Sequence, residues 1–344
     1  MGPAKTIGID LWAGQSRGVN QNVATCYRPA QEVTQLRSMR QLFLGAYTRF
    51  AERCREVDEP GVALLADDEA TGVPAGLVRL RARCGRHVAA IVGRHDECDL
   101  YLTGHGSLAL RHLAIVLDPV QSWSRDQAAV RYRILDLRTE SGFTDEEGKP
   151  MRGLRTEGPA LVRCASHAIF VLPLGDPTDW PEKPGDAWAM LPERVYFDEM
   201  RSRPGGSLTR MPSDVAKRQT LIFRTHGPRD TGMALVESGE VAGLLEVLGE
   251  RRSGTLTIGD RALRDGVLLG RYARCDGAEM LEDISMSRVH MLLLQTDDAL
   301  LAIDTCSRNG SHLPGQASAR VIAITGDTEI HLGKHTRIRW RWTD

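Results

Sequence analysis

Short runs of apolar residues, separated by turn-forming residues, occupy most of the chain after residue 75. In residues 76–175 they include "VAAIVGR", "LAIVL", "VRYRILDL" and "AIFVL", and in residues 221–344 they include "GLLEVLG", "TLTIG", "HMLLLQ" and "TRIRWRW". Short strands at close spacing are typical of β-sandwiches and β-barrels. The pattern predicts a mainly β protein with two β-rich domains, one at 76–175 and the other at 221–344.

The segment before these strands has a different hydrophobic period. Leu36, Phe43, Phe50 and Val57 recur at steps of seven residues, and "DEPG" follows them. This stripe predicts an amphipathic helix at about 32–57, inside an N-terminal segment that covers residues 1–75. We favour a helix that packs on the neighbouring domain, and the alternative is a helix that binds a partner protein.

Residues 176–220 separate the two β-rich stretches and are predicted to form a connector. They begin within "GDPTDWPEKPGD", which contains three prolines, and few β signals follow. Trp180, Trp188, Tyr196 and Phe197 are too apolar for a free linker. We therefore expect this connector to pack against another part of the chain.

Composition excludes several classes of protein. The 344 residues allow two or three domains, and a formal net charge of -1 gives no overall attraction to nucleic acid or membranes. The seven cysteines form no CxxC pair, which favours free thiols in a reducing compartment over disulfides or zinc. No apolar run approaches the ~18 residues of a membrane span. We expect a cytoplasmic protein without a metal or another cofactor, and the arginine-rich basic set suggests a bacterial origin.

The two β-rich stretches repeat one another. "VAAIVGRHDECDLYL" resembles "DGVLLGRYARCDGAEML", and "LRHLAIVL" resembles "SRVHMLLL". Arg94 precedes His112 by 18 residues and Arg271 precedes His290 by 19, so the register is preserved. The repeat predicts two copies of one domain.

Polar residues lie at the ends of the apolar runs in the second copy. They form three short motifs, which are Gly270-Arg271, Ser287-Arg288-x-His290 and Ser307-x-Asn309-Gly310. If these loops meet, they bring together two guanidinium groups, a hydroxyl and a carboxamide, with no carboxylate from the motifs. Such a group suits a compact dianion, and a phosphothreonine carries about −1.5 to −2 charge at neutral pH.

The motifs GR, SRxH and D-x-x-S-x-N-G, in this order, resemble those of the forkhead-associated (FHA) domain, an eleven-strand sandwich that binds phosphothreonine. The resemblance covers roughly residues 241–344. It implies that Arg271 and Ser287 bind the phosphate, that Arg288 assists at the phosphate or the peptide backbone, and that Asn309 holds the peptide main chain. Arg308 is a further candidate for added charge at the site.

Three residues of these motifs are expected to be structural. His290 is implied by the resemblance to bond within the loops and to have no ligand role. Gly310 allows the positive φ that directs Asn309 outward. Gly270 precedes the phosphate-binding arginine.

The first copy resembles the same fold but differs at the positions that correspond to the predicted ligand-binding residues. It keeps Arg94, but Ala109 and Leu110 align with the serine and the arginine of SRxH, and Ser141 replaces the asparagine. Loss of several charge-assisted hydrogen bonds abolishes phosphate binding. We expect a degenerate site in a module used for packing or protein contact, and the alternative is that Ser107 replaces the missing hydroxyl through a shifted loop.

The resemblance implies a non-enzymatic phosphothreonine-peptide reader or scaffold in bacterial Ser/Thr-kinase signalling. Its partner would be a phosphothreonine-containing protein, either a Ser/Thr kinase or a kinase substrate. The chain has no P-loop, HExxH, nucleophile-elbow or kinase motif. One alternative is a phosphate-independent structural assembly protein that uses both modules for protein contacts. Another is an enzyme or effector module in residues 1–75, for which no catalytic set is present.

Thr209, Thr220 and Thr225 lie near basic residues in or beside the connector. If a kinase phosphorylates one of them, it becomes a ligand for the Arg271 site, in cis or in a second molecule. That event would give self-association or an intramolecular switch. We favour the simpler interpretation, in which all three are ordinary loop and strand hydroxyls.

Overall fold

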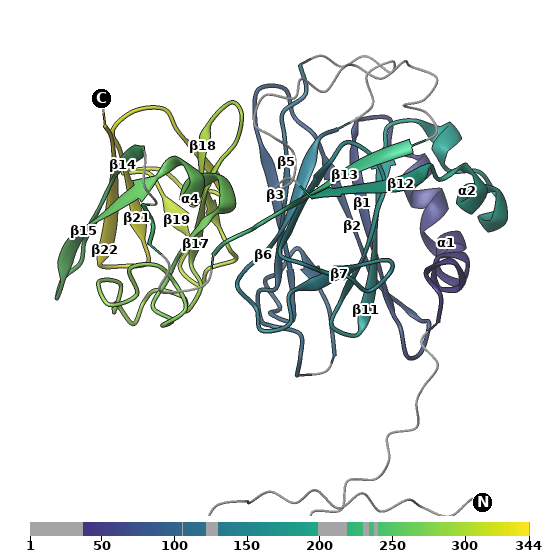
Figure 1. Cartoon of the computed structure of the whole chain (residues 1–344), viewed down its shortest axis with the longest axis horizontal. Coiled ribbons are helices and arrows are strands. Elements are labelled where there is room, and N and C mark those ends of the chain that lie inside the picture. The colour runs from purple at the N-terminus through teal and green to yellow at the C-terminus, as the bar shows by residue number, and fades with distance from the viewer. Residues whose placement is uncertain are drawn as a thin grey trace, which may run out of the picture.

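The computed structural model describes residues 37–104, 106–121, 130–198, 219–229, 234–236 and 240–343. These residues form two β-sandwiches side by side, with helices at the far end of the first one (Figure 1). We call the sheets built from residues 61–225 the first sandwich and those built from residues 241–342 the second sandwich. The prediction of a mainly β fold with a helix near the N-terminus is confirmed.

The first sandwich consists of a six-stranded and a seven-stranded sheet. The six-stranded sheet has the order β2 (Pro74–Arg81), β1 (Gly61–Asp68), β11 (His167–Leu174), β10 (Ala160–Cys164), β7 (Phe143–Asp145) and β8 (Pro150–Met151). The seven-stranded sheet has the order β12 (Glu193–Asp198), β13 (Gln219–Thr225), β9 (Gly153–Thr156), β6 (Tyr132–Asp136), β5 (Leu113–Leu117), β3 (Val88–Gly93) and β4 (Leu100–Tyr101). Their inner faces share one apolar core that includes Leu64, Val92, Ile115 and Ile169.

The second sandwich is smaller. Its five-stranded sheet has the order β15 (Ser253–Gly259), β14 (Val241–Leu248), β22 (Thr336–Trp342), β21 (Thr328–Leu332) and β19 (Ser311–His312). Its four-stranded sheet has the order β16 (Val267–Leu269), β17 (Met291–Gln295), β18 (Leu300–Asp304) and β20 (Val321–Ile324), with the short helix α4 (Asp260–Asp265) beside it. Leu293, Ile330 and Trp340 lie in the core between these sheets.

The boundaries predicted at residues 76 and 221 do not match the strand pairing. β1 lies in the segment assigned above to residues 1–75, yet it pairs with β2 and β11 inside the first sandwich. β13, most of which was assigned to the second domain, pairs antiparallel with β9 of the first sandwich. The first seven residues of β1 are buried, so the strand shows no polar alternation to reveal it. The first sandwich therefore extends at both ends beyond residues 76–175.

The connector is also more structured than its sequence indicated. It contains a 3₁₀ turn, η2 (Pro177–Asp179), the helix α2 (Pro184–Met190) and the strand β12, which pairs in parallel with β13. Trp180 is buried, and its ring stacks on that of Tyr47 at a centroid distance of 5.9 Å. The connector thus packs on the first sandwich, and residues 199–218 lie outside the described part of the chain.

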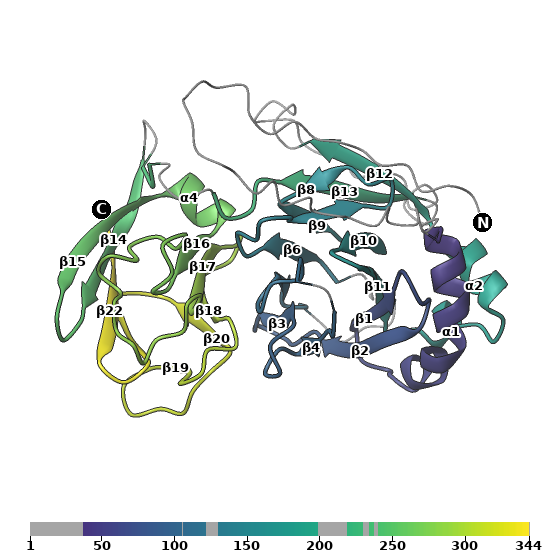
Figure 2. The ribbon, with the colours of Figure 1, turned by 90° about the horizontal axis from the view of Figure 1, so that it is seen from below.

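The N-terminal helix, α1 (Met39–Arg55), covers the outer face of the six-stranded sheet (Figure 2). A capping box begins it: Ser38 Oγ accepts from the Gln41 N–H, and Gln41 Oε1 accepts from the Ser38 N–H. Phe43 lies edge-on to Phe170 of β11, with ring centroids 5.5 Å apart. The helix packs on its own neighbouring sandwich, which is the interpretation favoured above. Within the described residues, no helix has both the length and the apolar character needed to cross a membrane.

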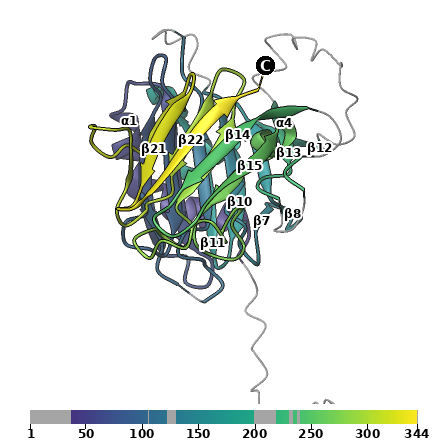
Figure 3. The ribbon, with the colours of Figure 1, turned by 90° about the vertical axis from the view of Figure 1, so that its left-hand side faces the viewer.

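The two sandwiches bury a sheet face against each other, so that in Figure 3 one lies in front of the other. Alternate residues of the facing strands leave their own cores and enter this interface. They come from equivalent positions of β3, β5 and β6 in one sandwich and of β16, β17 and β18 in the other, and include Ile91, Ala114, Val116, Leu135, Leu268, Leu292, Leu294 and Ile303. Because both faces of these strands are buried, most of them, β6 excepted, read as nearly continuous apolar runs.

Ion pairs also cross the same interface. Arg138 Nη2 lies 2.5 Å from Asp276 Oδ2 with both side chains buried, and Arg320 Nη2 lies 3.5 Å from Asp99 Oδ2 in a more exposed position. Asp99 and Asp276 are themselves equivalent, since each accepts the N–H of a residue eight positions earlier. The interface places the loops of the two sandwiches next to one another.

Candidate functional site

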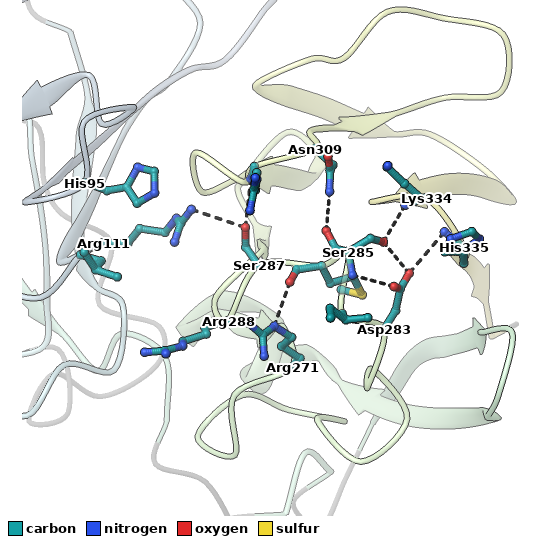
Figure 4. Close-up of a pocket in the computed structure, with 14 residues that line it drawn as sticks. His95, Arg111, Arg271, Asp283, Ser285, Ser287, Arg288, Asn309, Lys334 and His335 are labelled. Carbon is teal, nitrogen blue, oxygen red and sulfur yellow. Dashed lines mark hydrogen bonds between the residues drawn. The ribbon is translucent and has the colours of Figure 1, made fainter.

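A pocket lies where the loops of the second sandwich meet the edge of the first (Figure 4). All the sequence-predicted ligands of the second copy line it, namely Arg271, Ser287, Arg288, Arg308 and Asn309. Three further lining residues, His95, Leu110 and Arg111, belong to the first sandwich. The folded chain thus brings the predicted site residues together and adds residues from the other sandwich.

Arg271 is positioned by the turn that follows β16. Its backbone N–H donates to Ser287 O at 3.4 Å, and its Nε donates to Met286 O at 3.0 Å. The side chain is otherwise exposed and pairs with no carboxylate of the described residues. Gly270 is required at the preceding position, because a Cβ there would lie 2.2 Å from Arg288 O. One side of the Arg271 fork is fixed, and its terminal nitrogens remain available to an anion.

Ser287 lies at the base of the pocket. Only 8% of the residue is exposed, and its Oγ accepts from the Arg308 N–H at 3.0 Å. Its own hydroxyl hydrogen is therefore free to donate to an acceptor in the pocket. Arg288 and Arg308 are exposed at the rim, where long side chains can adjust to a ligand.

His290 is fully buried and holds the loops together. Its Nδ1 accepts from the Ser287 N–H at 3.1 Å, so Nε2 carries the hydrogen and donates to Gly310 O at 3.3 Å. Burial lowers the pKa of His290, although Asp304 opposes the shift, and the ring is neutral near pH 7. The structure places His290 behind the pocket wall and outside the ligand space.

The loop that carries Asn309 is shaped by one carboxylate. Asp304 accepts from the Ser307 N–H at 2.7 Å and from the hydroxyls of Ser307 and Ser311, each at 2.6 Å. Gly310 follows with φ 71°, a left-handed conformation that favours glycine. Asn309 Nδ2 donates to Ser285 O at 2.6 Å, while its Oδ1 accepts no hydrogen bond from the described residues. The Oδ1 atom is thus available to a peptide N–H.

The pocket wall contains one carboxylate that the sequence did not single out, Asp283. It accepts from Ser285 N–H and Oγ, each at 2.8 Å, from Thr336 Oγ1 at 3.1 Å and from the His335 N–H at 3.3 Å. Burial raises the pKa of Asp283, but these hydrogen bonds outweigh burial and hold it below its usual range. The carboxylate shapes the turn and forms no ion pair with a pocket arginine.

The charge of the pocket is strongly positive. Its cationic lining residues are Arg111, Arg271, Arg288, Arg308 and Lys334, against the single carboxylate of Asp283. The hydroxyl of Ser287 and the amide of Asn309 add neutral hydrogen-bonding groups to this lining. A dianion with several acceptor oxygens is the ligand that such a set fits best.

The corresponding loops of the first sandwich have the same frame without the same ligands. Arg94 Nε donates to Leu108 O, Ala109 N–H donates to His112 Nδ1, and His112 Nε2 lies 2.8 Å from Gly142 O. These bonds repeat those of Arg271, Ser287 and His290 and support the alignment of the two copies. Exposed residues Glu140 and Ser141 stand at the positions of Arg308 and Asn309, while Ala109 and Leu110 replace the serine and the arginine. This site lacks both the hydroxyl and the charge of the second.

Among the lining residues from the first sandwich, sequence reasoning missed Arg111 and His95. Arg111 aligns with Val289, an apolar interface residue of the second copy. An arginine at a position that is apolar in the other copy indicates a special role for that residue. Which role it has depends on how the two sandwiches pack against each other. The packing itself cannot be read from either copy alone.

Comparisons with known proteins find that the chain is similar to solved structures of FHA domains. No family model matches the chain, and no curated protein matches it. Among solved structures it is similar to FHA-1 of Rv1747 from Mycobacterium tuberculosis, at 24% identity and TM-score 0.24 over 30% of this chain and 99% of that one. It is also similar to the FHA domain of CT664 from Chlamydia trachomatis, at 20% identity and TM-score 0.26 over 30% and 99% of the two chains. A third match, from work on phosphothreonine-dependent FHA interactions, has 21% identity and TM-score 0.23 over 33% and 95%.

Proposed function

We propose that the chain is a non-enzymatic reader of phosphothreonine peptides and that the pocket of the second sandwich is its ligand site. The observation that carries the proposal is the lining itself, in which five cationic side chains, the Ser287 hydroxyl and the Asn309 amide surround one pocket. The motifs that supply most of these groups are those that resemble the FHA family. The partner is then a phosphothreonine-containing protein, either a Ser/Thr kinase or its substrate in bacterial signalling.

The geometry supports a role for each group. The terminal nitrogens of Arg271 and the Ser287 hydroxyl are free to bind phosphate oxygens, and charge-assisted hydrogen bonds of this kind are the strong ones. Asn309 Oδ1 is free to accept from the peptide backbone while its Nδ2 is anchored on Ser285. Arg288 and Arg308 at the rim attract the anion. Binding and orientation account for all of these groups, so no step of bond making or breaking is required.

The proposed self-association through a phosphorylated connector has weaker structural support. Thr220 is buried in β13, and Thr225 lies in the same strand. A kinase would have to release β13 from β9 and β12 to reach them, which favours ordinary strand hydroxyls. Thr209 lies outside the described residues.

The test is a screen of the full chain against a degenerate peptide library in phosphothreonine, phosphoserine and unmodified threonine forms. We expect selective capture of phosphothreonine peptides. Arg271→Ala should weaken binding of the selected peptide by about 10–100-fold, because hydrogen bonds to charged groups contribute about 1.5–3 kcal/mol. Arg94→Ala is the matched control, since Arg94 has the same backbone bond in the first sandwich but does not line the pocket. Capture that ignores phosphate and Arg271 would favour the phosphate-independent assembly protein.

A further inference from the structure

Arg111 reaches out of the first sandwich into the wall of the second sandwich's pocket. Its Nε donates to Thr305 O at 2.5 Å, and its Nη2 donates to Cys306 O at 2.5 Å. Its Nη2 also lies 3.5 Å from Ser287 Oγ. In Figure 4 the Arg111 side chain extends from the opposite side of the pocket toward Ser287. The guanidinium thus touches both the loop that carries Asn309 and the serine at the base of the pocket.

No carboxylate of the described residues forms an ion pair with Arg111, and Asp304 and Glu97 act on its charge only from farther away. The residue is 6% exposed, and none of the described acidic side chains lies within ion-pair distance of its guanidinium. Two backbone carbonyls satisfy part of the fork, and Nη1 donates to no described residue. A buried guanidinium without a directly paired carboxylate is costly, and a bound anion would supply that pairing.

Other arginines at the interface differ in this respect. Arg138 is paired with Asp276 at 2.5 Å, and Arg133 donates to Gln295 O and lies 3.7 Å from Asp297. Each joins the sandwiches with an acidic partner present. Arg111 crosses the same interface without an ion-pair partner and ends beside the buried Ser287 hydroxyl. Its surroundings match those of an anion ligand better than those of an interface ion pair.

We propose that Arg111 completes the phosphate site of the second sandwich from across the interface. The first sandwich, which lacks a site of its own, then contributes a cation to the site of its neighbour. This inference rests on the proposed function, because it assigns one more ligand to the same phosphate. It explains why an arginine occurs where the second copy has Val289, and it makes the packing of the two sandwiches part of the binding site.

The experiment measures the affinity of the full chain for the selected phosphothreonine peptide by fluorescence anisotropy. Arg111→Gln should weaken binding by about 10–100-fold, and Arg111→Lys, which keeps the charge but loses the fork, should fall between Arg111→Gln and wild type. Arg133→Gln is the matched control: it crosses the same interface, is 8% exposed and does not line the pocket. We expect it to bind like wild type.

The outcomes separate this inference from the proposed function. If Arg111→Gln binds the peptide as tightly as Arg133→Gln while Arg271→Ala binds it weakly, the inference is overturned and the proposed function stands. Equal weakening by Arg111→Gln and Arg133→Gln also overturns it, since the effect then comes from the interface in general. A wild type without phosphate-dependent binding overturns both proposals.

A second readout addresses any loss of stability in Arg111→Gln. The phosphorus NMR shift of the bound peptide, followed against pH at saturating protein, reports the second phosphate pKa, which lies near 6 in free phosphothreonine. A guanidinium in contact with the phosphate lowers that pKa, so Arg111→Gln should raise it relative to wild type and Arg133→Gln. An unchanged bound pKa in Arg111→Gln contradicts direct contact.

Discussion

The buried ion pair between Arg138 and Asp276 provides a quantitative test of the interface between the sandwiches. Asp276 Oδ2 accepts from Arg138 Nη2 at 2.5 Å and from the Leu268 N–H at 3.0 Å, and the two side chains are 4% and 8% exposed. Its equivalent, Asp99, accepts from the Ile91 N–H at 2.8 Å but pairs with an arginine that is 31% exposed. The two aspartates thus accept the same backbone hydrogen bond and differ in how deeply the aspartate and its arginine are buried.

Asp276→Ala should lower the free energy of unfolding by about 3–5 kcal/mol, because it leaves the Arg138 charge buried without a counter-charge. Asp99→Ala should lower it by roughly 1–2 kcal/mol, since it loses a similar backbone hydrogen bond and an ion pair that water screens. The expected difference of about 2–3 kcal/mol is the added cost of leaving the buried Arg138 charge without its counter-charge.

Urea unfolding of the full chain, followed by tryptophan fluorescence, measures both values. Trp180 reports the helix cluster of the first sandwich and Trp340 the core of the second. Because the two sandwiches share a buried apolar interface, we expect one coincident transition in wild type. Equal losses in the two variants would refute the argument about the buried pair, and two separate wild-type transitions would refute the coupling of the sandwiches.

Three further predictions concern other parts of the chain. Both oxygens of Asp67 are buried without a hydrogen bond, and burial raises its pKa to about 7. Because the unfolded carboxyl ionises near pH 4, the wild type should lose up to about 4 kcal/mol of stability relative to Asp67→Asn as the pH rises from 4 to 7. Urea unfolding at several pH values would detect this loss. Ile284 lines the pocket and is 87% exposed. Ile284→Ser should therefore weaken binding of the selected peptide several-fold, or by about 1 kcal/mol, as a titration would measure. The melting temperature should stay unchanged. Ser38→Ala removes the cap of α1 and should lower the free energy of unfolding by about 1 kcal/mol, whereas an unchanged value would show that the capping box contributes nothing.

Local pattern was enough to predict the strands that make up most of both sandwiches. "LAIVL" and "HMLLLQ" form β5 and β17 with the buried strand residues expected. The interface between the two sandwiches was not predicted. A strand that is buried on both faces has the same apolar sequence whether a helix or another sheet covers its second face. The same ambiguity hid β1, which α1 covers, and it moved the first predicted domain boundary.

The predicted ligands of the second copy lie together because the motif spacing fixes which loops they occupy. Arg271 and Ser287 are linked directly by a backbone hydrogen bond, and Asn309 reaches the same pocket. Asp283 was missed since its part is to shape a turn and no motif marks it. Arg111 was missed since it belongs to the other copy, and only the packing of the sandwiches brings it to Ser287.

The central claim is that the pocket of the second sandwich binds phosphothreonine. Isothermal titration of the full chain with one library-selected peptide, in its phosphothreonine form and its unmodified form, tests it most directly. We predict saturable one-to-one binding of the phosphorylated peptide, weakened about 10–100-fold in Arg271→Ala and unchanged in Arg94→Ala, with no saturable binding of the unmodified peptide. Equal binding of the two peptides, or equal binding by wild type and Arg271→Ala, would contradict it.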